Sequence, residues 1–210
     1  STGFGSNAIG NASLAEGYYS TAIGHGANAK AERTLAAGHG AIASGKNATA
    51  VGLDSQSTDE GATAIGNYSV AEGFYSTAVG TEARAKKEYD LAAGHEAIAS
   101  GGQSTAMGYQ SKASGIASNA IGRNANASGI LSMALGADSV AQGIDSAAIG
   151  RDAKALGDES IALGARAEAL AKNSTALGSE SAAKKEMDLA VGYNAIASGE
   201  QSTAVGFKSQ

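Results

Sequence analysis

Glycine recurs every seven residues from one end of this 210-residue chain to the other. Counting from Gly3 to Gly206 in steps of seven gives 30 positions, and 25 of them are glycine. The five exceptions are Ala31, Asp59, Lys87, Ala171 and Lys185. The spacing never shifts, so the array contains no insertion or deletion. A fixed period of this kind is typical of repeat proteins, in which each unit packs only on its neighbours.

The residue just before each of these glycines shows that the true repeat is twice as long. In every second heptad this residue is apolar, as in Ile23 and Ile65, whereas in the alternate heptads it is mostly polar, as in Glu16 and Lys30. All five glycine exceptions fall in the polar series. The repeating unit is therefore 14 residues long and consists of two unlike heptads.

Small residues occupy alternate positions in both heptads. Alanine stands two residues before the repeating position in 28 of 30 cases, and serine or alanine usually stands four before it, as in Ser20, Ala22 and Gly24. A spacing of two places these side chains on one face of a short strand. A helix is disfavoured, because regularly placed glycine costs about 1 kcal/mol each relative to alanine.

The pattern predicts an all-β chain that coils as a parallel β-roll, or solenoid. Each 14-residue rung contributes two short strands, for example Ser20–Gly24, and adjacent rungs lie about 4.8 Å apart. The narrow interior admits only the small residues. No break in composition divides the array, so we expect a single repeat domain over residues 1–210, cut as a segment from a longer protein.

The apolar residue before every second glycine has no place inside such a tube, so it must point outward. On a single chain these residues form a stripe larger than soluble monomers usually expose. We therefore expect copies of the chain to cover the stripe in a closed homo-oligomer. The predicted interface residues are Ile9, Ile23, Val51, Ile65, Val79, Met107, Ile121, Leu135, Ile149, Leu163, Leu177, Val191 and Val205.

Composition and motifs predict no catalytic residue, cofactor or metal. The net charge of −5 argues against nucleic-acid binding, because no basic stripe is available for phosphates. The chain has no cysteine, and no apolar run approaches the length of a transmembrane helix. The three histidines and the adjacent carboxylates fall at turns, where we expect them to be solvated: His25, His39, His95, Asp59-Glu60 and Asp158-Glu159.

Aromatic residues at turns are better candidates for contact with a ligand. Tyr18, Tyr19, Phe74 and Tyr75 lie in turns of the polar series, and the alternative is that they cap neighbouring rungs or chains. Two charged runs, Lys86–Asp90 and Lys184–Asp188, lose the repeating glycine but keep the count. We interpret both runs as altered outer turns.

The sequence motifs also resemble a known family. Asn7–Gly10, Ser20–Gly24 and Ser118–Gly122, recurring at 14 residues, are similar to the YadA-like head repeats of trimeric autotransporter adhesins. The resemblance implies a left-handed coil, a parallel homotrimer, and a place on the bacterial cell surface. It further implies attachment to a host extracellular-matrix protein or cell-surface receptor without catalysis. Anchoring in the outer membrane would depend on C-terminal parts that are absent from this sequence.

Two other functions compete with this interpretation. A recurring threonine suggests an ice- or surface-binding β-solenoid; its members are Thr21, Thr49, Thr63, Thr77, Thr105, Thr175 and Thr203. Oligomerisation would bury this row, and leucine interrupts it at positions 35, 91 and 189. An acyltransferase on a β-helix is disfavoured, because enzymes of that class have a six-residue sequence repeat, whereas the period here is seven.

Overall fold

The chain is an all-β parallel solenoid, as the sequence predicts. The computed structural model describes residues 1–210 and contains strands and turns without any helix. It therefore holds no helix that could cross a membrane. The chain divides into two compact units, residues 1–103 and residues 104–210, which are described separately. The prediction of a single domain remains a prediction.

The first unit contains fourteen strands in two parallel sheets. Its odd-numbered sheet consists of β1 (Asn7–Ile9), β3 (Thr21–Ile23), β5 (Leu35–Ala37), β7 (Thr49–Val51), β9 (Thr63–Ile65), β11 (Thr77–Val79) and β13 (Leu91–Ala93). Its even-numbered sheet consists of β2 (Leu14–Ala15), β4 (Asn28–Ala29), β6 (Ile42–Ala43), β8 (Gln56–Ser57), β10 (Val70–Ala71), β12 (Arg84–Ala85) and β14 (Ile98–Ala99).

The second unit repeats this arrangement. Its odd-numbered sheet consists of β15 (Thr105–Met107), β17 (Asn119–Ile121), β19 (Met133–Leu135), β21 (Ala147–Ile149), β23 (Ile161–Leu163), β25 (Thr175–Leu177), β27 (Leu189–Val191) and β29 (Thr203–Val205). Its even-numbered sheet consists of β16 (Lys112–Ala113), β18 (Asn126–Ala127), β20 (Val140–Ala141), β22 (Lys154–Ala155), β24 (Glu168–Ala169), β26 (Ala182–Ala183) and β28 (Ile196–Ala197).

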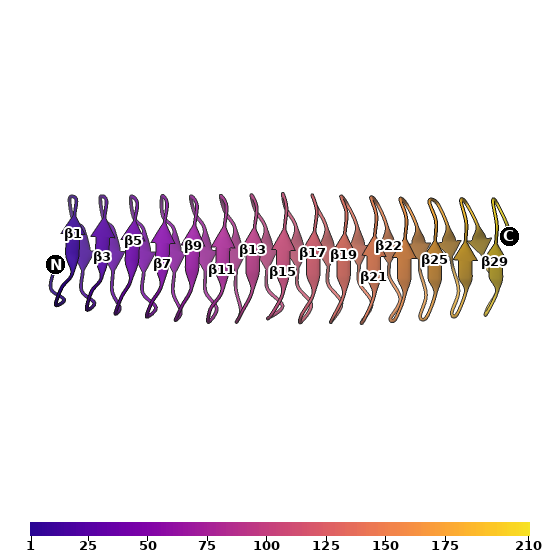
Figure 1. Ribbon diagram of the computed structural model, residues 1–210, viewed down its shortest axis with the longest axis horizontal. Helices are drawn as coiled ribbons and strands as arrows, with labels where there is room; N and C mark the ends of the chain where they lie inside the picture. The colour runs from indigo at the N-terminus through magenta and orange to yellow at the C-terminus, as the bar shows by residue number, and fades with distance from the viewer. The chain divides into compact units, whose positions relative to one another are not determined.

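Each strand pairs in parallel with the strand one rung away, in a register of 14 residues. In β3 and β5, for example, Ala22 lies opposite Ala36 and Ile23 lies opposite Ala37. The hydrogen bonds between rungs are short, such as the 2.8 Å bond from the Gly38 N–H to the Ile23 carbonyl. Figure 1 shows the odd-numbered strands of each unit side by side in chain order. Register is thus fixed by the repeat length itself.

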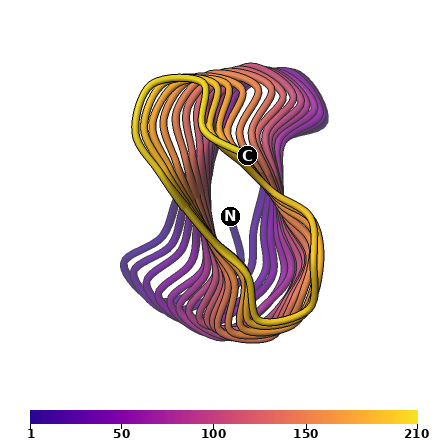
Figure 2. The same ribbon diagram turned by 90° about the vertical axis from the view of Figure 1, so that its right-hand side faces the viewer.

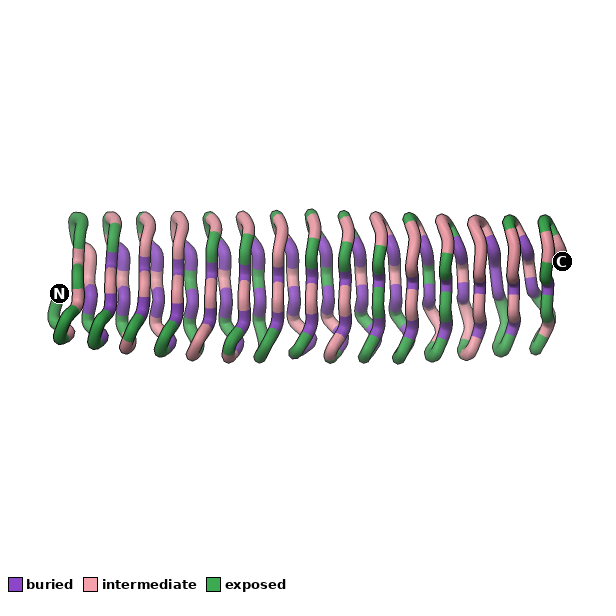
Figure 3. Tube along the Cα trace, in the orientation of Figure 1, coloured by how far each residue is buried: buried purple, intermediate pink, exposed green.

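The core of each unit is a column of alanine and serine. Ala22, the central residue of β3, is fully buried, and so are Ser20 before it and Ala15 in β2. From β3 onward, the central residue of each odd-numbered strand is buried between two residues that are half-buried or exposed (Figure 3). Several interior serines use their hydroxyl to close the adjacent turn, as Ser132 does by donating to the Gly129 carbonyl at 2.7 Å. Serines such as Ser132 therefore both fill the tube and close its turns, whereas the buried hydroxyls of Ser20, Ser57, Ser76 and Ser118 have no hydrogen-bond partner.

Two columns of tight turns connect the sheets (Figure 2). An A turn follows each odd-numbered strand and its glycine, as at residues 25–26; a B turn precedes each odd-numbered strand, as at residues 18–19. The second residue of every turn has a left-handed backbone, with φ of 55° at Tyr19 and 57° at Tyr68. Most of these residues are not glycine, although each such position costs about 1–2 kcal/mol. The stacked turns hold this conformation through bonds such as Tyr19 N–H to the Phe4 carbonyl at 2.9 Å.

The glycine that follows an odd-numbered strand has a backbone that other residues rarely adopt. At Gly66 φ is +132°, and an added Cβ would lie 2.4 Å from the Gly80 carbonyl oxygen. The glycines of the alternate series lack a positive φ. This difference explains why all five exceptions, including Asp59 and Lys87, fall in the alternate series.

Candidate functional site

In each unit the predicted interface residues form an outward row on the odd-numbered sheet, and we call this row the apolar stripe. Each is the last residue of its strand, as Ile23 is in β3 and Leu163 is in β23. Because the preceding alanine points inward, these side chains point outward; Ile23 is 42% exposed and Ile9 is 61% exposed. The structure thus places the residues where the sequence predicts, and their role in an interface remains a prediction.

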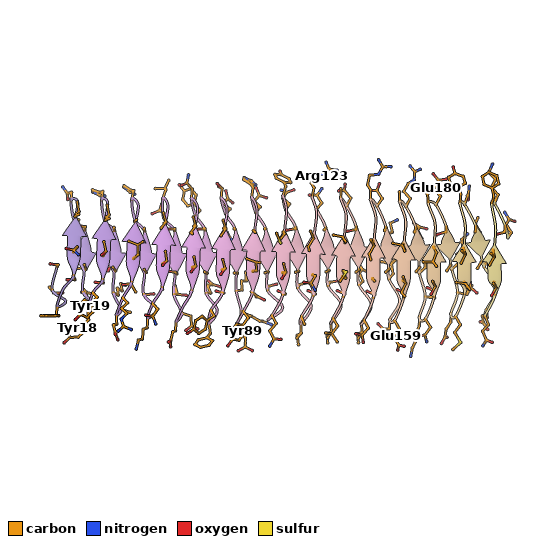
Figure 4. The ribbon with its side chains drawn as sticks, in the orientation of Figure 1. Tyr18, Tyr19, Tyr89, Arg123, Glu159 and Glu180 are labelled. Atoms are coloured by element: carbon orange, nitrogen blue, oxygen red, sulfur yellow. The ribbon has the colours of Figure 1, made fainter.

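The four predicted ligand-contact residues lie in B turns of the first unit. Tyr18, Tyr19 and Tyr75 are exposed, and Phe74 is half-buried. Figure 4 shows Tyr18, Tyr19 and Tyr89 projecting from the same edge. The chain brings them together as two separate clusters rather than as one, because only residues in adjacent rungs can touch.

Each aromatic cluster contains one member that the sequence analysis missed. Phe4 meets the Tyr19 ring edge to face at 5.9 Å. Tyr89 lies parallel to Tyr75, with ring centroids 6.2 Å apart, and Phe74 packs its edge or face against both rings at 4.5 and 6.0 Å. The 14-residue repeat could have predicted both residues, since turn residues 14 apart lie next to each other on adjacent rungs.

The A turns carry histidines, aromatic residues and charged pairs. His25 and His39 stack with ring centroids 4.9 Å apart, and Tyr193 and Phe207 stack at 5.6 Å. The chain contains no group of three histidine, aspartate or glutamate side chains that could hold a metal. A stacked pair in a solvated turn column offers neither a pocket nor a converging set of ligands.

Charged side chains of the second unit lie on both edges. Figure 4 places Arg123 and Glu180 on the A-turn edge and Glu159 on the opposite edge. Hydrogen bonds from Asn124 and Arg123 hold the pKa of the Asp138 carboxyl below its usual value. Arg123 and Asp138 form an ion pair at the solvated surface. Solvated ion pairs of this type contribute little to stability.

The adjacent carboxylates bond to backbone rather than to one another. The Asp59 carboxylate accepts the Glu60 N–H at 2.8 Å, and the Asp158 carboxylate accepts the Ile144 N–H at 2.9 Å. Such contacts tie down turns and leave no carboxylate pair poised for acid–base chemistry. The pairs therefore have a structural explanation.

The interpretation of the charged runs as wholly outer turns is wrong for their last residue. In Lys86–Asp90 the first four side chains are exposed, but Asp90 is only 1% exposed, and Asp188 is equally buried in the second run. These aspartates occupy the interior position that serine or alanine fills in the other rungs, apart from Thr34. The Asp90 carboxylate accepts the N–H groups of Lys87 at 2.9 Å and Gly102 at 3.0 Å.

The Asp188 carboxylate is held in the same way. It accepts the Lys185 N–H at 2.8 Å, and both the N–H and the hydroxyl of Ser202 at 2.9 Å. Burial alone would raise the pKa of this carboxyl, but the hydrogen bonds from Ser202 and Lys185 outweigh burial and lower it. Serine closes a turn by donating to a carbonyl, whereas aspartate closes it by accepting from an N–H.

The fold and surface together define a repeat solenoid whose exposed side chains are arranged in ladders rather than around a pocket. The family model described as YadA head domain repeat matches residues 1–27, 15–42, 43–69, 71–97, 99–125, 127–153, 155–181 and 183–209. The chain therefore belongs to the YadA head repeat family.

One solved structure supports the same relationship. The crystal structure of the collagen-binding domain of the Yersinia adhesin YadA is 27% identical, with a TM-score of 0.53. The match covers 70% of this chain and 82% of that one. No curated protein sequence matches the chain.

Proposed function

We propose that the chain is the head of a homotrimeric bacterial surface adhesin that attaches to host extracellular matrix or a cell-surface receptor without catalysis. The observation that carries this proposal is the run of YadA head repeats along the whole chain. The similar Yersinia structure is titled as a collagen-binding domain, so collagen is the first ligand to test.

Binding by such a head rests on multiplicity rather than on a deep pocket. Each rung presents its outward residues about 4.8 Å from those of the next, so a fibrous ligand meets a ladder of equivalent contacts. Three copies of the chain multiply these contacts. Simultaneous weak contacts raise the apparent affinity by about 10²–10⁴ without any strong single site.

The competing ice- or surface-binding function has less support. Thr63 and Thr77 lie in register on adjacent strands, but Leu91 follows them in the same row. All three residues are half-buried beside the apolar stripe. A surface that orders water needs an exposed regular row, and this row is interrupted.

The proposal is tested by measuring binding of the assembled chain to immobilised collagen, fibronectin and laminin. We expect saturable binding to at least one of them, with apparent affinity falling when the protein is dissociated into single chains. Replacement of Tyr18, Tyr19, Phe74 and Tyr75 by alanine tests the aromatic turns. Unchanged binding by this variant, with assembly intact, would remove those residues from the ligand surface.

A further inference from the structure

Two B turns of the first unit carry the same aromatic motif, 56 residues apart. Residues 16–20 and 72–76 share the order Glu, Gly, aromatic residue, Tyr, Ser. Both tyrosines have a left-handed backbone, with φ of 55° at Tyr19 and 50° at Tyr75. Because the two copies have the same turn and nearly the same rings, the differences between their neighbours show how their surfaces differ in binding chemistry.

In both copies the tyrosine ring lies against a glycine of the preceding rung. An added Cβ on Gly5 would stand 2.9 Å from Cδ1 of Tyr19, and one on Gly61 would stand 2.5 Å from Cδ1 of Tyr75. No other B turn of the chain has glycine at its second position. Tyr19 is nevertheless 58% exposed and Tyr75 is 49% exposed. Each ring is therefore seated on the backbone and open to solvent.

The first copy is followed by a carboxylate that the chain itself neutralises. The next rung brings Glu32 and Arg33, and the Arg33 N–H donates to the Tyr18 carbonyl at 2.8 Å. The Glu32 carboxylate pairs with Arg33 at 3.6 Å and with Lys46, one rung further along, at 3.3 Å. The aromatic turn of this copy thus adjoins a carboxylate whose cations come from the same chain.

The second copy keeps the carboxylate and loses both cations. Glu88 corresponds to Glu32, but Tyr89 and Gly102 stand where the first copy has its arginine and lysine. Glu60, one rung before Phe74, and Glu88, one rung after it, form no ion pair. Unpaired carboxylates therefore border the rings on both sides. We call this surface the acidic aromatic turn; it consists of Glu60, Phe74, Tyr75, Glu88 and Tyr89.

The two lysines close to the acidic aromatic turn do not neutralise it. Lys86 and Lys87 are exposed, and neither forms an ion pair. The Lys87 side chain extends toward the next rung, where its Cδ lies 3.8 Å from the position of a Cβ on Gly102. No lysine or arginine lies over the three rings, whereas Lys208 lies over Phe207 at 5.2 Å in the other unit.

We propose that the acidic aromatic turn binds an arginine side chain of the host protein. The proposal rests on the proposed function, since it names the ligand group that an aromatic turn of the adhesin recognises. A guanidinium stacks on an aromatic face and donates N–H groups in a planar fork that matches a carboxylate. At the first copy the chain's own cations meet the carboxylate, and at the second the partner supplies the cation.

The charge of the surrounding surface favours the same partner. The first unit contains ten Asp or Glu residues and six Lys or Arg residues, so it attracts a basic segment. A single exposed contact of this kind is weak, because cation–π contacts and surface ion pairs each contribute about 1 kcal/mol or less. Attachment then depends on several such contacts made at once.

The first experiment compares two blocked tripeptides, one with a central arginine and one with citrulline, which has nearly the same shape and no charge. Each is added to the assembled chain carrying ¹³C-labelled tyrosine rings, and NMR records the ring signals. We expect saturable shifts of the Tyr75 and Tyr89 signals with the arginine peptide at concentrations on the order of 10 mM. The Tyr18 and Tyr19 signals should not shift. Equal shifts with citrulline, or no shift with arginine, overturn the proposal.

The second experiment removes the carboxylates and keeps the rings. Combining Glu60→Gln with Glu88→Gln should weaken binding of the arginine peptide by about fivefold or more. The matched control is Glu32→Gln, since that carboxylate already pairs with the chain's own cations. We expect the control to bind within about twofold of the parent. Unchanged binding by the Glu60 and Glu88 double variant overturns the proposal.

A third experiment converts the first copy into the second. Arg33→Tyr with Lys46→Gly changes two exposed turn residues and places at the first copy the residues found at the second. The Tyr18 and Tyr19 signals should then shift with the arginine peptide and not with citrulline. Circular dichroism checks that the variant keeps the fold. A folded variant whose signals do not respond contradicts the proposal.

Binding to matrix proteins separates this inference from the proposed function. A chain that binds the arginine peptide but not collagen, fibronectin or laminin would contradict the adhesin function and leave the arginine site intact. A chain that binds one of these proteins equally well after Glu60→Gln and Glu88→Gln would contradict only the arginine site. Both properties should instead weaken together in the double variant.

Discussion

Backbone conformation at single positions decides which glycines of this chain can be replaced. Gly66 and Gly73 both sit against the carbonyl of the next rung, with an added Cβ at 2.4 Å and 2.0 Å from oxygen. Only Gly66 has a positive φ, of +132°. One rung from Gly73 on either side, Asp59 and Lys87 occupy the equivalent position, so the backbone there can adjust to a side chain.

Gly66→Ala should therefore destabilise the fold more than Gly73→Ala. The additional cost is about 1–3 kcal/mol, which is the strain of holding a non-glycine residue in a forbidden backbone region. Chemical denaturation of the two purified variants, with the parent as reference, measures the difference in unfolding free energy. Equal losses would show that contact with the neighbouring carbonyl, and not φ, limits both positions.

The buried carboxylate of Asp188 makes the stability of its turn dependent on pH. Its folded-state pKa is lowered, so its contribution is present at neutral pH and is lost as pH falls below about 3.8 and through the lower folded pKa. Asp188→Asn removes charge-assisted bonds to Ser202 and Lys185. It should cost about 2 kcal/mol at pH 7.

The free-energy difference between Asp188→Asn and the parent should begin to shrink as pH falls below about 3.8, because the carboxyl of the unfolded parent then takes up a proton that the folded carboxyl takes up only at lower pH. Denaturation curves at several pH values measure this convergence. Asp145→Asn, at an exposed B-turn residue, serves as control and should change unfolding by no more than about 0.5 kcal/mol at pH 7. A difference for Asp188→Asn that stays constant as pH falls below about 3.8 would assign the effect to packing.

At the scale of the element, the glycine period was enough to predict strands, turns and an interior of alanine and serine. It did not predict the left-handed residue in each turn, because Tyr19, Glu82 and Asp138 share no chemical type that marks this conformation. It also misplaced Asp90 and Asp188, because burial of aspartate depends on N–H groups that only the folded turns bring together. Sequence spacing located the aromatic turns. Because residues 14 apart lie on adjacent rungs, the same spacing could also have assigned Phe4 and Tyr89 to the aromatic clusters.

The 14-residue rung should be the smallest segment that can be removed without disrupting the coil. Deleting residues 115–128 removes one complete rung. Odd-numbered strands then still pair with odd-numbered strands, and even-numbered strands with even-numbered ones. Deleting residues 115–121 removes one heptad, so odd-numbered strands would meet even-numbered ones and the positive-φ glycines would lose their partners. Nearest-neighbour packing makes the first deletion tolerable.

Circular dichroism and thermal unfolding distinguish the two deletions. The 14-residue deletion should keep a β-rich spectrum and one cooperative transition, with a modest loss of stability proportional to the missing rung. The seven-residue deletion should lose cooperative unfolding in the second unit. Equivalent behaviour of the two proteins would mean that the heptad, and not the rung, is the structural unit.

At the scale of the whole molecule, a core of alanine and serine buries little apolar area per residue. Fully burying a Val, Leu or Ile side chain contributes about 1.5–3 kcal/mol, but these residues lie on the outside of the coil. Periodicity therefore predicts that the chain needs partners. The number of partners and the hand of the coil follow only from family resemblance, because neither changes the spacing of residues.

Ile65→Asp tests this dependence directly. Ile65 is the last residue of β9 and is 41% exposed on the single chain. In the proposed trimer a carboxylate there would be buried without a partner, at a cost of several kcal/mol for each copy. We expect sedimentation to show loss of the trimer at micromolar concentration, together with a lower unfolding temperature. Gln56→Asp, an exposed change on the even-numbered sheet, should leave both properties unchanged. A stable trimer carrying Ile65→Asp would place the interface on another face of the coil.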